Sequence, residues 1–231
     1  MMPMQQLLLE LSPLPAPSFG SFYPGRNAAA LAALAEAIAG GERLVCLWGE
    51  PGSGKSHLLR AFVNEAVARG LAARYVAAPH VQLAEPEGER EALAVDDVER
   101  LNDAGQLALF DRFNALKAGG GRLITTAPCP PAELTLREDL RTRLGAGLVL
   151  RLLPLDDAEK TAALAWHAAS RGIRLAPEIA AYLHNHCERD MGTQMAVLDA
   201  LDRHSLEQRR PITLPLLRDA LKTLFGADAR N

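Results

Sequence analysis

A glycine-rich segment early in the chain has the spacing of a phosphate-binding loop. It reads Gly49-Glu50-Pro51-Gly52-Ser53-Gly54-Lys55-Ser56 and is followed by His57. In such loops, successive backbone N–H groups and a helix N-terminus point at phosphate oxygens. Lys55 is then expected to pair with the β- and γ-phosphates, and the hydroxyl of Ser56 to ligate Mg²⁺. A simple glycine turn is the alternative, but the complete pattern predicts that this segment binds ADP or ATP.

Two adjacent acids, Asp96 and Asp97, follow a short apolar run at residues 92–95. A carboxylate at the end of a buried strand can hold a magnesium ion from the far side of the phosphates. We therefore expect Asp96 to serve the metal and Asp97 to orient or activate a water molecule. Taken alone, two such acids are more typical of a helix cap or a solvated loop. Their combination with the phosphate loop favours a catalytic site.

Helices and strands alternate around these motifs, as the positions of apolar residues indicate. Helices are expected at residues 27–39, 56–69 and 103–117, and strands at 44–48, 74–77, 92–95, 122–126 and 148–152. Strands that alternate with helices favour an α/β fold, with a parallel sheet covered by helices on both faces.

After residue 152 the pattern becomes purely helical. Helices are expected at 156–170, 177–188, 191–207 and 215–225, separated by glycine and proline. The predicted domains are a tail and proline-rich tether at 1–18, a nucleotide-binding αβα domain at 19–150 and an all-helical lid at 151–231.

Composition excludes several other classes of protein. The formal net charge of −3 and the absence of a long basic run argue against a stand-alone nucleic-acid binder. The 3 cysteines have neither disulfide-framework nor zinc-site spacing. The first residues lack a basic signal-peptide start, and no apolar run approaches the roughly 20 residues that span a bilayer. We therefore expect a cytoplasmic protein that does not enter the membrane.

Several further segments, in a defined order, carry a family resemblance. They are Phe19-x-x-Phe22-x-x-Gly25-x-Asn27, Asp96-Asp97-Val98-x-x-Leu101, Leu123-Ile124-Thr125, Asp139-Leu140-Arg141-Thr142-Arg143-Leu144 and Arg189-Asp190-Met191. Together with the phosphate loop, the chain resembles the AAA+ family of P-loop NTPases, in the group of DnaA replication initiators and their shorter regulatory relatives. The phosphate-site motifs occur in many NTPases, and their order with the other segments is what points to this group.

The resemblance implies roles for several residues. Residues 22–26 would border the adenine, and Arg189 would contact the phosphates as a sensor 2 residue. Arg143 would be an arginine finger that reaches the nucleotide of a neighbouring subunit. Arg141 is an alternative finger, and an ordinary solvated arginine is the alternative for either position.

One position departs from the family pattern. Relatives usually have a polar sensor 1 residue, often Asp or Asn, where this chain has Ala127. Weak or absent intrinsic hydrolysis is therefore expected, unless Thr125 or Thr126 takes over the role.

The N-terminal tail resembles a motif that binds the DNA polymerase III sliding clamp. It contains Gln6, Leu7, Leu9 and Leu11, and a proline-rich tether follows. An extended segment can place alternate leucines in an apolar groove while a glutamine amide fixes its register. Leucine-rich chain ends are more often frayed or packed on their own domain, but the position ahead of a tether favours clamp binding of moderate affinity.

The resemblance implies an adaptor that binds DnaA and the sliding clamp, and reaches DNA indirectly through the clamp. It would stimulate ATP hydrolysis by DnaA and so restrain initiation. The chain ends at Asn231, so we expect no DnaA-type helix-turn-helix domain. A DnaC-like helicase loader and a clamp-bound scaffold without effect on hydrolysis are alternative functions. The sequence does not specify whether the chain forms a homo-oligomer.

Overall fold

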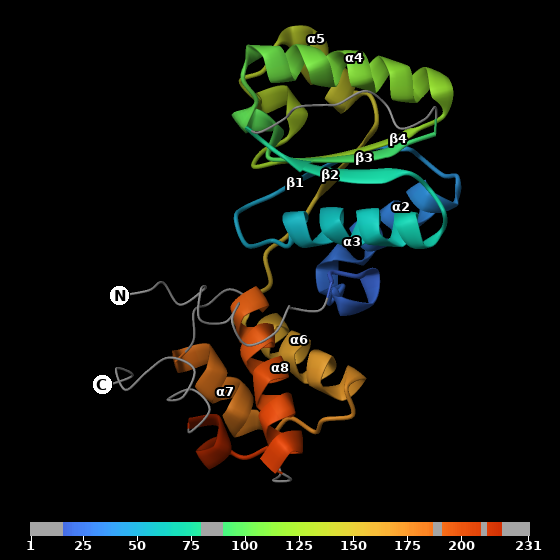
Figure 1. Cartoon of the computed structure of the whole chain (residues 1–231). Coiled ribbons are helices and arrows are strands. Elements are labelled where there is room, and N and C mark those ends of the chain that lie inside the picture. Colours follow the sequence, from blue (N-terminus) through green and yellow to red (C-terminus); the bar gives the residue numbers. More distant parts are fainter. Residues whose placement is uncertain (1–15, 80–89, 187–190, 209–211, 219–231) are drawn as a thin grey trace. The chain divides into compact units, whose positions relative to one another are not determined.

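The computed structural model describes residues 16–79, 90–186, 191–208 and 212–218 (Figure 1). Residues 16–154 form one compact unit, and the chain from Leu155 onward belongs to a second. The first unit is an α/β core and the second is helical, so the predicted fold class is confirmed.

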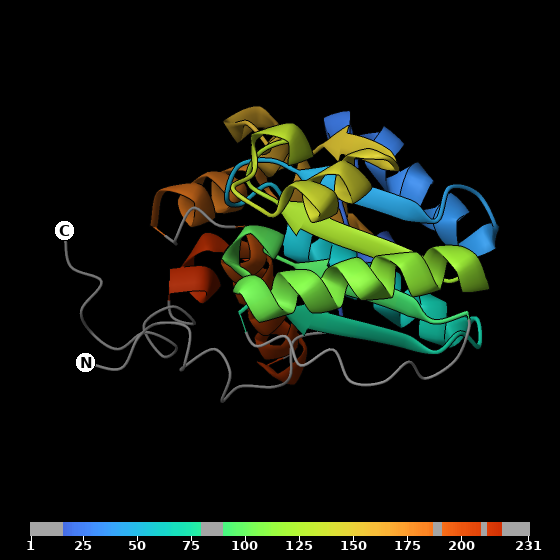
Figure 2. The same cartoon turned by 90° about the horizontal axis from the view of Figure 1, so that it is seen from above.

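The core contains a fully parallel five-stranded sheet. Its strands are β1 (Leu44–Trp48), β2 (Ala73–Ala77), β3 (Ala92–Asp96), β4 (Arg122–Ala127) and β5 (Leu148–Arg151), in the spatial order β2-β3-β4-β1-β5. Figure 2 shows the strand arrows running side by side in one direction. The phosphate loop follows β1 and the paired acids follow β3, so β4 separates the two motifs at the carboxyl edge of the sheet.

Helices cover both faces of the sheet. Helices α2 (Ala28–Ala39) and α3 (Lys55–Ala68) lie on one face, and α4 (Asp103–Gly119) and α5 (Glu138–Gly145) lie on the other (Figure 1). Short 3₁₀ helices occur at Phe19–Ser21, Gly25–Asn27, Val98–Arg100 and Pro131–Glu133.

Each face of the sheet has its own apolar core. Leu34 and Phe62 pack with Ile124 of β4 on the face of α2 and α3. Leu123, the neighbouring residue of β4, packs with Phe113 on the opposite face. This alternation is the period-two pattern of a strand, and burial on both faces explains why the strands are almost continuously apolar.

Helix α5 was not among the elements expected from periodicity. It has only eight residues, most of them polar or charged. Leu140 and Leu144, four residues apart, form its single buried stripe. Packing against the core therefore stabilises a helix whose own apolar pattern is too short to predict it.

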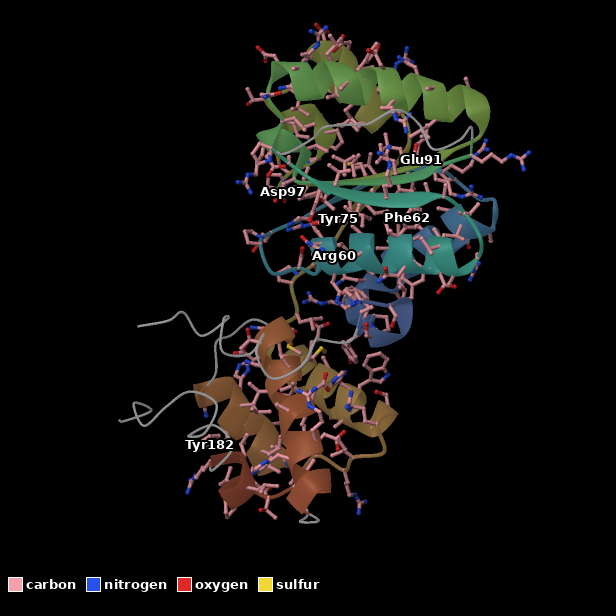
Figure 3. All side chains as sticks on the ribbon, viewed as in Figure 1. Arg60, Phe62, Tyr75, Glu91, Asp97 and Tyr182 are labelled. Carbon is pink, nitrogen blue, oxygen red and sulfur yellow. The ribbon has the colours of Figure 1, made fainter. Side chains whose placement is uncertain are left out.

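A buried ion cluster lies at the amino end of β3, at the opposite end of that strand from Asp97 (Figure 3). Glu91 is fully buried and its carboxylate pairs with Arg74 at 2.6 Å and with Arg112. A buried carboxylate is tolerated only when it is paired in this way. The two arginines thus compensate the buried charge at the start of the strand that carries the acids.

The second unit contains α6 (Asp157–Ser170), α7 (Pro177–His186) and α8 (Met191–Gln208), and residues 214–218 are also helical. Leu164, Leu183, Leu201 and Leu217 form part of its apolar core. His167 of α6 also contacts Asp199 of α8 at 2.7 Å. The remainder of the helix expected at 215–225 lies outside the described residues.

Candidate nucleotide-binding site

The phosphate loop requires glycine for steric reasons at two positions. A Cβ atom at Gly49 would lie 2.3 Å from the carbonyl oxygen of Leu152. Gly54 has a left-handed φ of 92°, and a Cβ atom there would lie 2.8 Å from the ring of Phe22. Glycine adopts such a conformation without the penalty that a Cβ atom brings. The turn between β1 and α3 is therefore a close-fitting backbone cradle.

The polar groups of the loop have the chemistry of a phosphate site. The Nζ of Lys55 donates to the carbonyl oxygens of Gly49 at 2.7 Å and Glu50 at 3.0 Å. The buried Oγ of Ser53 has no hydrogen-bond partner among the described residues. A phosphate oxygen could accept from both groups, and a buried hydroxyl left unpaired is costly. Ser56 lies exposed in the first turn of α3, where its hydroxyl is free to meet a metal ion. These residues fit a magnesium nucleotide.

The segment preceding α2 packs against this loop. Phe22 is buried, and its ring centroid lies 5.9 Å from that of His57. The Nε2 of His57 lies 3.2 Å from the Oγ of Ser21, and burial lowers the pKa of this histidine below its ordinary value. Asn27 exchanges two hydrogen bonds of 2.9 Å with the backbone of Leu153. The segment predicted to border the adenine is thus anchored beside the phosphate loop.

Asp96 is held by hydroxyl donors from the two neighbouring strands. Tyr75 of β2 donates to its Oδ2 at 2.7 Å, and Thr126 of β4 donates to its Oδ1. Burial raises the pKa of Tyr75 to about 12, and the carboxylate of Asp96 adds to this shift. The phenol is therefore a protonated donor at neutral pH. Motif spacing singled out Asp96 as a candidate, whereas the contact of Tyr75 with it depends on strand pairing and was not predicted.

Asp97 turns the chain away from the strand. It has a left-handed φ of 55°, its N–H donates to the Oγ1 of Thr126 at 2.9 Å, and its carboxylate lies 3.6 Å from Arg100. Glu99 follows in the same turn, and one of its carboxylate oxygens is buried without a hydrogen-bond partner in the described part of the chain. Burial raises the pKa of Glu99, while the positive charge of Lys55 opposes the shift. This third acid beside the phosphate loop was missed because its spacing matches no motif.

The segment predicted to hold the sensor 1 residue ends beside the loop. Ala127 is fully buried, and its carbonyl oxygen accepts from the N–H of Gly49 at 3.1 Å. Its methyl group offers no polar contact. The hydroxyl of Thr126 is hydrogen-bonded to both Asp96 and Asp97. The buried hydroxyl of Thr125 faces the thiol of Cys46 without a normal hydrogen bond.

Arg143 lies at a different surface of the core. Its guanidinium carbon is 5.8 Å from the ring centroid of Phe110 and 6.0 Å from that of Phe113. It lines an open hollow of about 780 Å³, together with Phe110, Arg137, Glu138, Asp139 and Thr142. None of these residues belongs to the phosphate loop, and Arg141 does not line the hollow. The structure thus separates the two candidate fingers.

Solved structures of replication and recombination proteins share this fold. Domain III of the DnaA initiator from Thermotoga maritima has 23% identity and a TM-score of 0.69, covering 93% of this chain and 100% of that one. AMPPCP-bound DnaA from Aquifex aeolicus has 21% identity and a TM-score of 0.66, covering 84% and 67%. The RuvB Holliday junction branch migration motor of Thermotoga maritima has 17% identity and a TM-score of 0.61, covering 87% and 69%. At these identities the likeness shows a shared AAA+ fold.

The helical unit matches a family model of its own. The family model described as the Hda lid domain matches residues 157–221. The lid residues of this chain are thus similar to those of the Hda family, and its core has the fold of DnaA domain III. RuvB shares the fold of the core as well, whereas the helical unit matches the Hda lid domain.

Some predicted site residues of this chain lie outside the described residues. They are Arg189 and the tail residues Gln6, Leu7, Leu9 and Leu11. In the part of the chain that is described, no group of three or more His, Cys, Asp or Glu side chains could hold a metal ion by itself. No described helix is long and apolar enough to cross a membrane.

Proposed function

We propose that this protein is a nucleotide-binding adaptor that binds the sliding clamp and stimulates hydrolysis of ATP by DnaA, and thereby limits initiation of DNA replication. The observation that carries the proposal is the combination of two features in one chain. One is a phosphate loop whose tight backbone turn accommodates only glycine at two positions, and the other is a match to the Hda lid domain. The same lid favours this function over a DnaC-like helicase loader.

The nucleotide would be ADP or ATP with Mg²⁺. Structures of DnaA, which shares this fold, were determined with AMPPCP bound. In this chain the loop N–H groups and Lys55 would bind the phosphates, while Ser56 and Asp96 would hold the metal. When bound, Mg²⁺ neutralises phosphate charge. With Ala127 at the sensor 1 position, we expect the site to bind nucleotide and hydrolyse it slowly.

Arg143 would act on the nucleotide of DnaA. It lines an open hollow away from its own phosphate loop, so its charge is available to another molecule. A guanidinium beside a transferring phosphoryl group stabilises the negative charge that develops on its oxygens. DnaA would supply the phosphate loop, the metal site and the attacking water, and this chain would add the arginine.

The N-terminal tail would bring the protein to the clamp. The motif of Gln6 and the alternate leucines fits the addition of an extended peptide to an apolar groove. A clamp loaded on DNA would then concentrate the adaptor near its partner, because a tether raises effective concentration without new contacts.

The decisive experiment is an assay of ATP hydrolysis by DnaA in the presence of this protein, with and without clamp loaded on DNA. We expect stimulation that requires both this protein and the loaded clamp. Unchanged hydrolysis in the complete mixture would refute the adaptor function and leave a clamp-bound scaffold.

A further inference from the structure

Tyr75 and Asp96 meet because of the register between β2 and β3. Tyr75 pairs with Ala94, and Ala77 pairs with Asp96. Side chains two residues apart on a strand lie on the same face, so Tyr75 and Asp96 are diagonal neighbours on one face of the sheet. The phenol spans this diagonal and donates to the carboxylate at 2.7 Å.

Arg60 supports the tyrosine from α3. Its guanidinium carbon lies 4.0 Å from the centroid of the Tyr75 ring, a cation–π distance. In Figure 3, Arg60 and Tyr75 lie between α3 and the sheet, near the strand end that carries Asp97. The helix that starts with Lys55 therefore also supplies the residue that covers this ring.

The carboxylate of Asp96 is oriented and still has free acceptor capacity. Tyr75 and Thr126 each donate to a different oxygen. A carboxylate has about four acceptor sites, so one hydrogen bond on each oxygen leaves room for a metal ion or its water. Asp96 is 2% exposed, so solvent cannot replace a lost donor freely.

We propose that Tyr75 is a positioning residue for the metal site: its hydroxyl fixes the orientation in which Asp96 meets the magnesium ion of the bound nucleotide. Arg60 braces the tyrosine ring. The inference rests on the proposed nucleotide site, and it gives a role to Tyr75, a residue that lies outside the motifs of that site. Partners that orient metal ligands are typically worth roughly 10–100-fold in metal affinity.

The test uses the full chain and the substitution Tyr75→Phe, which keeps the ring and removes only the donor. Mn²⁺, a spectroscopic substitute for Mg²⁺, is titrated into the protein–ADP complex, and free Mn²⁺ is counted by electron paramagnetic resonance. We expect Tyr75→Phe to weaken Mn²⁺ binding about tenfold. The affinity for ADP in EDTA should stay close to that of the parent, because the hydroxyl of Tyr75 donates to the proposed metal ligand Asp96.

Tyr182→Phe is the matched control. Tyr182 of the lid also has an arginine over its ring, with the Arg218 guanidinium carbon at 5.4 Å. The control should leave Mn²⁺ affinity unchanged. Unchanged Mn²⁺ affinity in Tyr75→Phe would overturn the inference, and so would an equal loss of Mn²⁺ and ADP affinity, which indicates a packing role. A parent protein that binds no ADP would overturn the proposed nucleotide function itself.

Discussion

The Oγ1 of Thr126 accepts a 2.9 Å hydrogen bond from the N–H of Asp97. The same hydroxyl donates to the carboxylate of Asp96, so one fully buried threonine links both acids at the end of β3. Asp97 needs this support because a left-handed conformation is unfavourable for a residue with a side chain.

Thr126→Val should destabilise the fold. The substitution keeps the shape of the side chain but leaves the N–H of Asp97 and one oxygen of Asp96 without this partner. We expect the free energy of unfolding to fall by about 1–3 kcal/mol. Urea denaturation followed by circular dichroism measures the change.

Thr125→Val is the control on the same strand. The buried hydroxyl of Thr125 makes no normal hydrogen bond, so its replacement by a methyl group should cost much less. Equal destabilisation by both substitutions would mean that the bridge at Thr126 contributes nothing beyond packing.

Lys55→Ala should sharply weaken nucleotide binding. The ammonium group is the cation of the phosphate loop, and its removal leaves several phosphate charges only partly compensated. Isothermal titration with ADP and with ATP tests this expectation. Lys117→Ala, which removes an exposed lysine near the end of α4, should leave both affinities unchanged. Unaltered binding by Lys55→Ala would refute the phosphate loop.

Mild acid should destabilise the protein partly through His57. Burial lowers the pKa of this histidine in the folded state, so below about pH 6.5 the unfolded state binds the proton more readily. The free energy of unfolding should therefore fall as the pH falls through this region. It should fall less steeply in His57→Gln. Parallel pH profiles for parent and variant would show that His57 does not contribute.

Clamp binding should reside in the N-terminal tail. A peptide of residues 1–12 should bind the clamp by itself. Replacement of Gln6 and Leu9 by alanine should remove most of the affinity, because it takes away the register and one buried anchor together. A pulldown that recovers as much clamp with the double variant as with the parent would show that the motif assignment is wrong.

Arg143→Ala should abolish stimulation of DnaA while leaving folding, nucleotide binding and clamp binding nearly intact. Arginine fingers contribute roughly 10³–10⁵ in rate in other NTPases. Arg143 lines the open hollow and none of its lining residues belongs to the phosphate loop, so its loss should not affect the protein's own nucleotide. Hydrolysis of ATP by DnaA, measured with loaded clamp, is the readout.

Two companion variants define the finger. Arg143→Lys should also fail substantially, because an ammonium on a flexible stem cannot reproduce the planar guanidinium fork. Arg141→Ala should stimulate normally. If Arg141→Ala fails and Arg143→Ala does not, the finger is two residues earlier, and if neither matters there is no finger in α5.

The sequence alone predicted the phosphate loop, the strand that leads to Asp96 and the alternation of strands with helices. These features depend on local sequence: a glycine-rich turn, a short apolar run and a period of 3.6 are all visible in a few neighbouring residues. The resemblance carried by segments such as Asp139–Leu144 also predicted a relative of DnaA, and both the DnaA-like fold of the core and the match of residues 157–221 to the Hda lid domain agree with this prediction. The nucleotide roles, the finger and the clamp motif stay predictions.

Tertiary structure decided which distant side chains meet. The order β2-β3-β4 places Tyr75 on one side of Asp96 and Thr126 on the other, and no local pattern connects these three positions. Helix α5 likewise forms because Leu140 and Leu144 find a core to pack against. Local preferences specify elements over a few residues, whereas strand order and register arise from burying the whole core at once, so contacts that depend on them cannot be read from spacing.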